Sequence, residues 1–243
     1  MKTPAIRLAL AVLAITSLAS CSSLLAPQPD HSRFFVLSTS ADGLAARPAT
    51  TALGTKELSV GVGPVRIPDY LQRSGIATRT GPTQVEYSQV NRWAEPLEQC
   101  FPRVLAQDLS ASLASNRVVL FPWPGNTRVD YQVQVNVERF ELTSQGQAVL
   151  LARWTIKSPQ TGAILASGEA NESRPAGSNA SSATAALSQT LGAMADSLAS
   201  RISQLALGTR RTERKESAAA PAFRAVERGP ASAISRRPSP AQA

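Results

Sequence analysis

The sequence predicts an α+β fold, in which an antiparallel sheet has two amphipathic helices packed on one face, as in a two-layer sandwich. Two observations support this prediction. Segments with strand-like patterns precede each of two helical stripes, so the order along the chain is strands, helix, strands, helix. The longest strand-like segments also alternate apolar with polar residues, which is typical of antiparallel sheets with one solvated face. Two helices that each carry one apolar stripe can cover the other face.

The first part of the domain is predicted to hold short strands. A Gly81-Pro82 pair between two of them indicates a hairpin-like break. Glycines in the alternating segment 58–65 indicate a bulge or a close backbone approach. Residues 67–71 form a predicted turn with large apolar side chains. The predicted strands are 33–37, 58–65, 76–79 and 85–87.

A first helix is predicted over 93–113. One apolar residue recurs at every fourth position, which makes a single stripe. Pro96 suits the first helical position, where a missing N–H costs nothing. Pro102 either bends the helix or marks where its regular part begins, and the sequence leaves both options open. The stripe consists of Leu97, Phe101, Leu105, Leu109 and Leu113.

The second part is predicted to be a meander of long strands followed by a second helix. The apolar series of the strand 131–142 slips by one residue at Arg139, which predicts a β-bulge. Further strands are expected at 147–157 and 163–170, and a Ser/Ala-rich linker follows them. Leucines and other apolar residues from Leu187 to Leu205 fall at helical spacing, and Gly208 is placed where a C-terminal cap belongs.

The N-terminus predicts a lipid anchor. Lys2 and Arg7 precede a short apolar run, as in a secretory signal. This run ends in Leu-Ala-Ser-Cys21, the pattern of a bacterial lipobox, in which the Cys21 thiol is acylated and the chain is cleaved before it. The alternative is a plain secretory peptide with a cysteine near its cleavage site. The residue after Cys21 is Ser22. An Asp at this position tends to retain a lipoprotein in the inner membrane, so Ser22 favours the outer membrane.

These features divide the chain into four parts. Residues 1–20 are the predicted lipoprotein signal peptide, 21–32 a tether, 33–207 the folded domain and 208–243 a disordered basic tail. The net charge of +8 comes mostly from the ends, because the tail alone carries a surplus of five positive charges. The folded domain is therefore close to neutral, and its charge does not support nucleic-acid binding. The tail either binds the anionic headgroups of membrane lipids or is a solvated appendage.

The composition argues against an enzyme. The only histidine, His31, lies in the tether, so the folded domain cannot hold a Ser-His-Asp or Cys-His device. With Cys21 acylated, Cys100 is left unpaired, and we expect it to be a small buried hydrophobe. One histidine and one free cysteine do not make an ordinary zinc site, so no metal or cofactor is expected. The carboxylate pairs Glu95/Glu98 and Glu138/Glu141 are expected on solvated faces. A hydrolase that uses such a pair remains a third hypothesis for the function.

Three segments carry a resemblance to a known family. They are Phe34–Leu37 (FFVL), Val62–Leu71 (VGPVRIPDYL) and Asn91–Leu97 (NRWAEPL). Together with the lipobox they make the chain similar to the PqiC/YmbA lipoproteins, the auxiliary lipoproteins of ABC-type transport systems. The segments around Val65–Leu71 and Arg92–Leu97 are expected to define the fold more than to make contacts with a partner.

The resemblance implies a non-catalytic outer-membrane lipoprotein. On this resemblance, the lipoprotein works with an MCE-domain protein that is anchored in the inner membrane and with the permease and ATPase of the same system. Together they would move lipid across the periplasm. It also implies a ring-shaped homo-oligomer. Cys21 is the lipidation site that the lipobox predicts, and the near-neutral domain predicts no nucleic-acid partner. The alternative is a structural lipoprotein that helps to assemble another outer-membrane complex.

Overall fold

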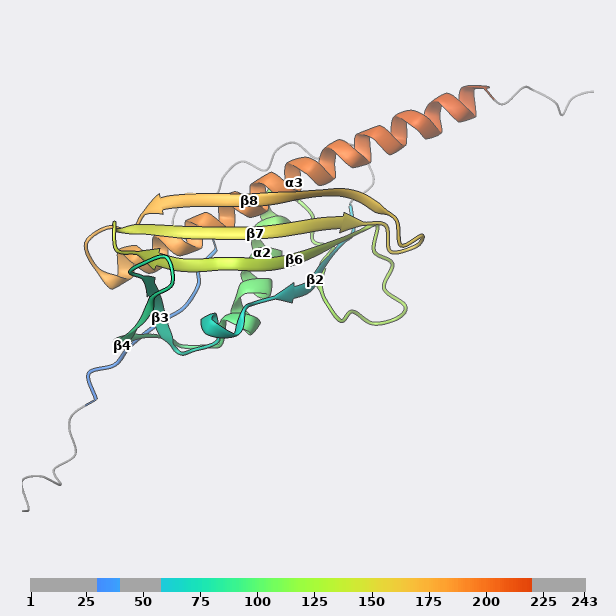
Figure 1. Ribbon diagram of the computed structural model, residues 1–243. Helices are drawn as coiled ribbons and strands as arrows, with labels where there is room; N and C mark the ends of the chain where they lie inside the picture. Colours follow the sequence, from blue (N-terminus) through green and yellow to red (C-terminus); the bar gives the residue numbers. More distant parts are fainter. Residues whose placement is uncertain (1–29, 40–57, 220–243) are drawn as a thin grey trace, which may run out of the picture.

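The computed structural model describes residues 30–39 and 58–219, and it has the predicted α+β architecture (Figure 1). Within these residues, eight strands form one open sheet, and two α-helices pack against it. The strands are β1 (Arg33–Phe35), β2 (Val60–Arg66), β3 (Gly75–Arg79), β4 (Val85–Trp93), β5 (Val118–Leu120), β6 (Tyr131–Thr143), β7 (Gln147–Lys157) and β8 (Ile164–Pro175). The helices are α2 (Leu97–Leu113) and α3 (Ala180–Ala219), and a short 3-10 helix, η2, spans Asp69–Leu71.

The sheet is mixed, which differs from the wholly antiparallel sheet that we expected. The β3–β4 hairpin and the β6–β7–β8 meander are antiparallel, as predicted. However, β2 lies between β5 and β6 and runs parallel to both, β1 runs parallel to β4, and β3 runs parallel to the end of β6. Parallel neighbours need a long crossover. Here the connection from β2 to β5 passes through η2, β3, β4 and finally α2, so the pairing depends on where the helix returns the chain.

The predicted bulge in the longest strand is confirmed. The register of β6 against β7 shifts between Val137 and Arg139. Before the shift, alternate valines of β6 face the helices and are buried. After it, Phe140 continues this buried face, while Glu141 lies on the opposite face.

The first helix begins later than predicted and contains Pro102. Trp93 belongs to β4 and not to a helix, and Pro96 is the N-cap residue that precedes α2. Pro102 is the sixth residue of α2 and leaves the carbonyl group of Glu98 without its usual intrahelical partner. Glu98 is exposed, so water can satisfy that carbonyl. The helix ends at Leu113 as expected, with Ala114 in the left-handed conformation (φ 48°).

The second helix is longer than predicted at both ends. Its 40 residues span about 60 Å, and its C-terminal part extends beyond the sheet (Figure 1). Asn179 caps its start, since its side-chain oxygen accepts a hydrogen bond from the Ser182 N–H at 2.9 Å. At the other end, the helix continues through Gly208 to Ala219, so Gly208 is not a cap and the predicted disorder is wrong for 208–219. One glycine costs a helix about 1 kcal/mol relative to alanine, and good helix formers follow it. The predicted tail from 220 onward lies outside the described residues.

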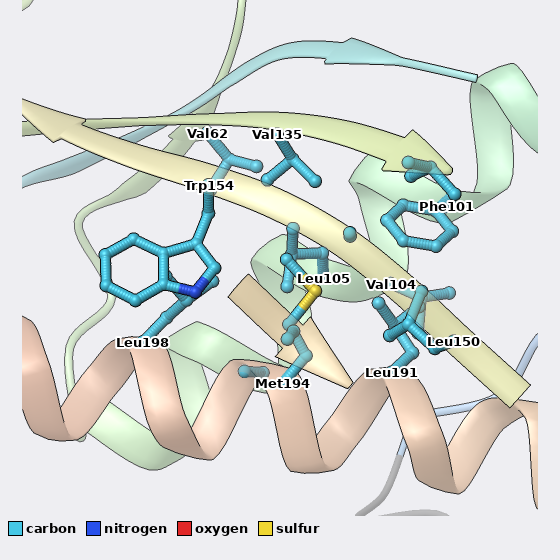
Figure 2. Packing of buried hydrophobic residues seen from close by; sticks show 14 of the residues in the cluster. Val62, Phe101, Val104, Leu105, Val135, Leu150, Trp154, Leu191, Met194 and Leu198 are labelled. Carbon is cyan, nitrogen blue, oxygen red and sulfur yellow. The ribbon is translucent and has the colours of Figure 1, made fainter. Parts of the chain in front are cut away.

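Both helices lie on the same face of the sheet and contact each other there. α3 packs over β6, β7 and β8, while α2 packs over β2 and β5. Figure 2 shows Leu191, Met194 and Leu198 of α3 facing the buried side chains of the sheet, with Leu105 of α2 between them. The fully buried side chains of α3 are Leu187, Leu191, Met194, Leu198 and Ile202.

Candidate functional site

The predicted lipidation site, Cys21, lies outside the described residues, but the end of the tether is within them. Asp30 to Ser32 have no regular structure, and β1 begins at Arg33. Eleven residues lie between Cys21 and Arg33, so the twelve steps of a fully extended tether reach at most about 40 Å. An anchored Cys21 would therefore keep β1 close to the membrane surface.

Two of the three sequence segments behind the family resemblance meet at the strand that follows the tether. Phe35 of β1 is in register with Trp93 of β4, and the Ala94 N–H donates a hydrogen bond of 2.8 Å to the Phe35 carbonyl. The Trp93 ring is buried and stacks on Phe140, with 6.4 Å between ring centroids. Phe140 in turn meets Phe101 of α2 edge-on at 5.3 Å. This aromatic chain joins β4, β6 and α2, so Trp93 fixes the end of the tether to the core.

The third segment contains Tyr70, which contacts a buried carboxylate. Glu141 of β6 is fully buried, and the Tyr70 hydroxyl lies 3.1 Å from its Oε2 and donates to it. The Tyr87 hydroxyl of β4 donates to the Tyr70 carbonyl at 2.9 Å. These two tyrosines hold η2 against the outer face of the sheet, where it covers Glu141.

Two arginines complete what we term the Glu141 cluster: Tyr70, Arg79, Arg139 and Glu141. Nε of Arg79 lies 2.5 Å from Glu141 Oε1, and Nε of Arg139 lies 2.8 Å from the same oxygen. The guanidinium group of Arg79 also lies over the Tyr70 ring, 5.9 Å from its centroid. The cluster joins η2, β3 and β6, which are far apart in sequence.

The expectation that Glu141 lies on a solvated face is therefore wrong. The bulge places Glu141 on the outer face, where a side chain would ordinarily meet water. Here η2 folds over that face and brings Tyr70 to it. A buried carboxylate needs paired charges and hydrogen bonds, and the two arginines and the tyrosine supply them.

At neutral pH, the charged and hydroxyl groups of the cluster bind one another. Burial, together with the charge of Glu141, raises the pKa of Tyr70 to about 12, so its hydroxyl stays protonated as a donor. The hydrogen bond to Glu141 raises the pKa of Arg79 above its ordinary value. Both carboxylate oxygens of Glu141 are thus engaged by partners within the protein, which fits a structural role for this residue.

The remaining chemistry-bearing residues lie apart from one another. Cys100 is fully buried, as expected, and burial with the nearby charge of Glu95 raises its pKa to about 12. It is therefore overwhelmingly the unreactive thiol at neutral pH. His31 is exposed in the tether. Within residues 30–39 and 58–219, no group of three or more His, Cys, Asp or Glu residues is placed to hold a metal ion.

The remaining carboxylates of the two predicted pairs are Glu95, Glu98 and Glu138. They form ordinary ion pairs or face solvent. Glu95 pairs with Arg103 at the start of α2. Glu138 pairs with Arg153 of β7 at 3.1 Å, and Glu98 is exposed. Arginines therefore hold Glu95 and Glu138 in place within the fold.

The sequence matches the model of a known protein family. A family model described as the ABC-type transport auxiliary lipoprotein component matches residues 37–199. This range contains η2, the Trp93 region, the whole sheet except β1, and the first half of α3. The last 20 residues of α3 lie beyond it. No curated protein matches the sequence.

Two solved structures share the fold over their full length. Protein XCC0632 from Xanthomonas campestris is 17% identical, with a TM-score of 0.58, and the match covers 74% of this chain and 99% of that one. An uncharacterized protein is 19% identical, with a TM-score of 0.56, over 70% of this chain and 98% of its own. A PelC dodecamer from Paraburkholderia phytofirmans is 19% identical over 60% of this chain and 91% of its own, but its TM-score of 0.32 is too low to support an argument about assembly.

In the described part of the chain, no helix has both the length and the apolar character that crossing a membrane requires.

Proposed function

Because the chain belongs to the family of ABC-type transport auxiliary lipoproteins, as its motifs predicted, we propose that it is the lipid-anchored, non-catalytic accessory of an MCE-type lipid transport system in the periplasm. The observation that carries this proposal is the family match over most of the folded domain. It includes the Val62–Leu71 and Asn91–Leu97 segments, whose side chains organise the Glu141 cluster and the end of the tether.

In this proposal Cys21 is acylated and holds the domain at the inner face of the outer membrane. Acyl chains add about 0.8 kcal/mol per buried methylene, and a multiply acylated cysteine anchors stably. Ser22 supports retention at the outer membrane. The domain then docks the distal end of a conduit formed by an MCE-domain protein, whose permease and ATPase lie at the inner membrane.

The motif side chains are not the docking surface in this proposal. The Trp93 ring is buried in the core, and Tyr70 and Glu141 bind each other on the outer face of the sheet. Their role is to fix the tether to the core and to shape the outer face. A partner must therefore bind elsewhere on the surface, either to one subunit or to a homo-oligomeric ring of the kind the resemblance implies. Native mass spectrometry of the purified lipoprotein would measure that stoichiometry.

Affinity capture tests the proposed partner. The native lipoprotein, tagged at its C-terminus, is captured from detergent-solubilised envelopes, and its partners are identified by mass spectrometry. We expect an MCE-domain protein or its permease to be enriched over a capture with an unrelated outer-membrane lipoprotein. Reproducible recovery of a different outer-membrane assembly, without MCE proteins, would contradict the proposal and support the alternative role in assembly.

A further inference from the structure

A polar hollow lies at the amino ends of three neighbouring parallel strands, β5, β2 and β6. Its volume is about 490 Å³, within the range of pockets that hold small ligands. Val60 of β2 is in register with Val118 of β5 on one side and with Tyr131 of β6 on the other. The segments that lead into these three strands therefore meet here. The polar lining consists of Ser59, Asn116, Arg117, Asn126, Thr127 and Arg128.

Buried Ser59 holds the main chain on both sides of the hollow. Its hydroxyl donates a hydrogen bond of 2.9 Å to the Arg128 carbonyl, and the Arg117 carbonyl accepts from the Val60 N–H at 3.0 Å. The Ser59 N–H in turn donates to Oδ2 of Asp130 at 3.0 Å. The backbones of Arg117 and Arg128 are thus fixed on opposite sides of β2.

A second buried serine completes the support of Arg117. The Ser115 hydroxyl donates to the Leu58 carbonyl at 2.7 Å and accepts the Arg117 N–H at 3.1 Å. Both main-chain groups of Arg117 are therefore hydrogen-bonded, while its side chain is free to move.

The two guanidinium groups are available to a ligand. Arg117 and Arg128 are both exposed, and among the described residues neither side chain has an ion pair or a hydrogen bond. In contrast, Arg79, Arg103, Arg139 and Arg153 are each paired with a glutamate. Guanidinium groups bind the oxygens of phosphate groups through two parallel N–H bonds. The neighbouring Asn126 and Thr127 side chains add further donors.

An apolar surface begins directly beside the hollow. Arg117 lies just before the edge strand β5, and Phe121, just after this strand, has a side chain that is 51% exposed. The Phe121 ring packs edge-on against Trp123, with 5.6 Å between centroids. A ligand held by its phosphate group in the hollow would therefore find these two aromatic side chains a few residues further along the chain.

We propose that this hollow binds the phosphate group of a glycerophospholipid, with Arg117 and Arg128 holding the phosphate oxygens and the Phe121 and Trp123 side chains contacting the acyl chains. The proposal does not depend on the transport role, because it concerns binding by the purified protein alone. Loss of the MCE partner in a capture experiment would leave it intact.

Titration calorimetry of the full chain in maltoside micelles, corrected for protein-free micelles, tests the proposal. The probes are dihexanoyl phosphatidylglycerol, glycerol 3-phosphate, inorganic phosphate and dihexanoylglycerol, which has the chains without the phosphate. We expect saturable binding of the phospholipid, weakened at least tenfold in the double variant Arg117→Gln/Arg128→Gln. The matched control, Arg33→Gln/Arg201→Gln, removes the same charge from exposed positions outside the hollow and should bind as the unaltered chain does.

Each outcome bears on one part of the proposal. Equal binding of glycerol 3-phosphate or inorganic phosphate would support the phosphate site but overturn its assignment to a lipid. Equal binding of dihexanoylglycerol, or equal weakening in the control double variant, would overturn the site itself. Unchanged thermal melting of both double variants, followed by circular dichroism, verifies that the comparison is between folded proteins.

Discussion

At the scale of single residues, the feature that most needs explanation is Glu141, a charged side chain with no exposure to solvent. Two arginines and one tyrosine bind its two oxygens. Such a group stabilises the fold only while all its partners are present, because a lone buried charge is costly. The cluster therefore ties η2, β3 and β6 together and makes the Tyr70 segment part of the framework.

Glu141→Gln should destabilise the protein strongly. The change removes the charge that both guanidinium groups face and leaves a buried amide among donors, so we expect the free energy of unfolding to fall by about 3 kcal/mol. Glu169→Gln is the matched control, because Glu169 is exposed and lies 3.9 Å from Arg153; we expect a change within about 0.5 kcal/mol. Urea denaturation followed by circular dichroism measures both. Equal, small effects would show that the cluster contributes little.

Tyr70 should make the stability depend on alkaline pH. Its pKa rises from 10.0 to about 12 on folding, so the stabilisation is complete below pH 10 and is lost as the pH rises from 10 to 12. Tyr70→Phe should flatten the fall in the free energy of unfolding within this window. The comparison is best made in a Cys100→Ala background, because the pKa of Cys100 is also raised, from 9.0 to about 12. An unchanged slope would mean that Tyr70 does not titrate in this way.

At the scale of elements, local sequence patterns predict most of the strands and helices. Where each one begins and ends depends on the strands and helices that it contacts. The bulge in β6 was visible in the sequence because the apolar series slips at Arg139. The extension of β4 to Trp93 was not visible, because it depends on pairing with β1 and β3. In β8, Gly168 lies opposite Trp154 of β7 and leaves room for the indole ring.

Gly168→Ala should therefore disturb the sheet. An added Cβ would lie 2.5 Å from Cζ2 of Trp154, so the buried ring must shift. We expect a loss of about 2 kcal/mol, as for overpacked cores, together with a changed near-ultraviolet signal from tryptophan. Gly125→Ala is the control, since nothing lies within 4 Å of its added Cβ. Thermal melts of both variants measure the effect, and an undisturbed Gly168→Ala variant would contradict this packing.

At the scale of the whole molecule, the tether enters the fold through an edge strand that is fastened to the core by Trp93. With Cys21 acylated as proposed, the membrane anchor would join the domain at this edge of the sheet. On the other side of β6, the hollow lies at the amino ends of β5, β2 and β6. In this arrangement the strand that follows the tether and the proposed lipid site lie on opposite sides of β6 in the same sheet.

Cys21→Ala should abolish lipid processing. The protein should lose incorporation of labelled palmitate and should leave the outer-membrane fraction, since no thiol is available for acylation. Cys100→Ala removes the other cysteine, which is buried in α2, and should leave both properties unchanged. Fractionation with metabolic labelling is the measurement. A Cys21→Ala protein that remains fully in the outer-membrane fraction would show that the N-terminal segment is not a lipobox.

The sequence by itself determined the features that depend on neighbours in the chain. The two-residue period of β6 and β7, the bulge, the apolar stripe of α3 and the family segments can all be found within short windows. The lipobox is an equally local pattern, so acylation of Cys21 could be predicted although Cys21 lies outside the described residues. The scarcity of histidine follows from the composition alone.

Only the tertiary structure decided which distant segments meet. The parallel pairing of β2, the burial of Glu141 under η2 and the approach of Arg117 to Arg128 all depend on contacts across long stretches of chain, such as that of Ser59 with Asp130. Alternation predicts which face of a strand a side chain occupies, but not what will cover that face. A charged residue on the outer face therefore looks solvated in sequence, and its burial follows only from the path of the rest of the chain.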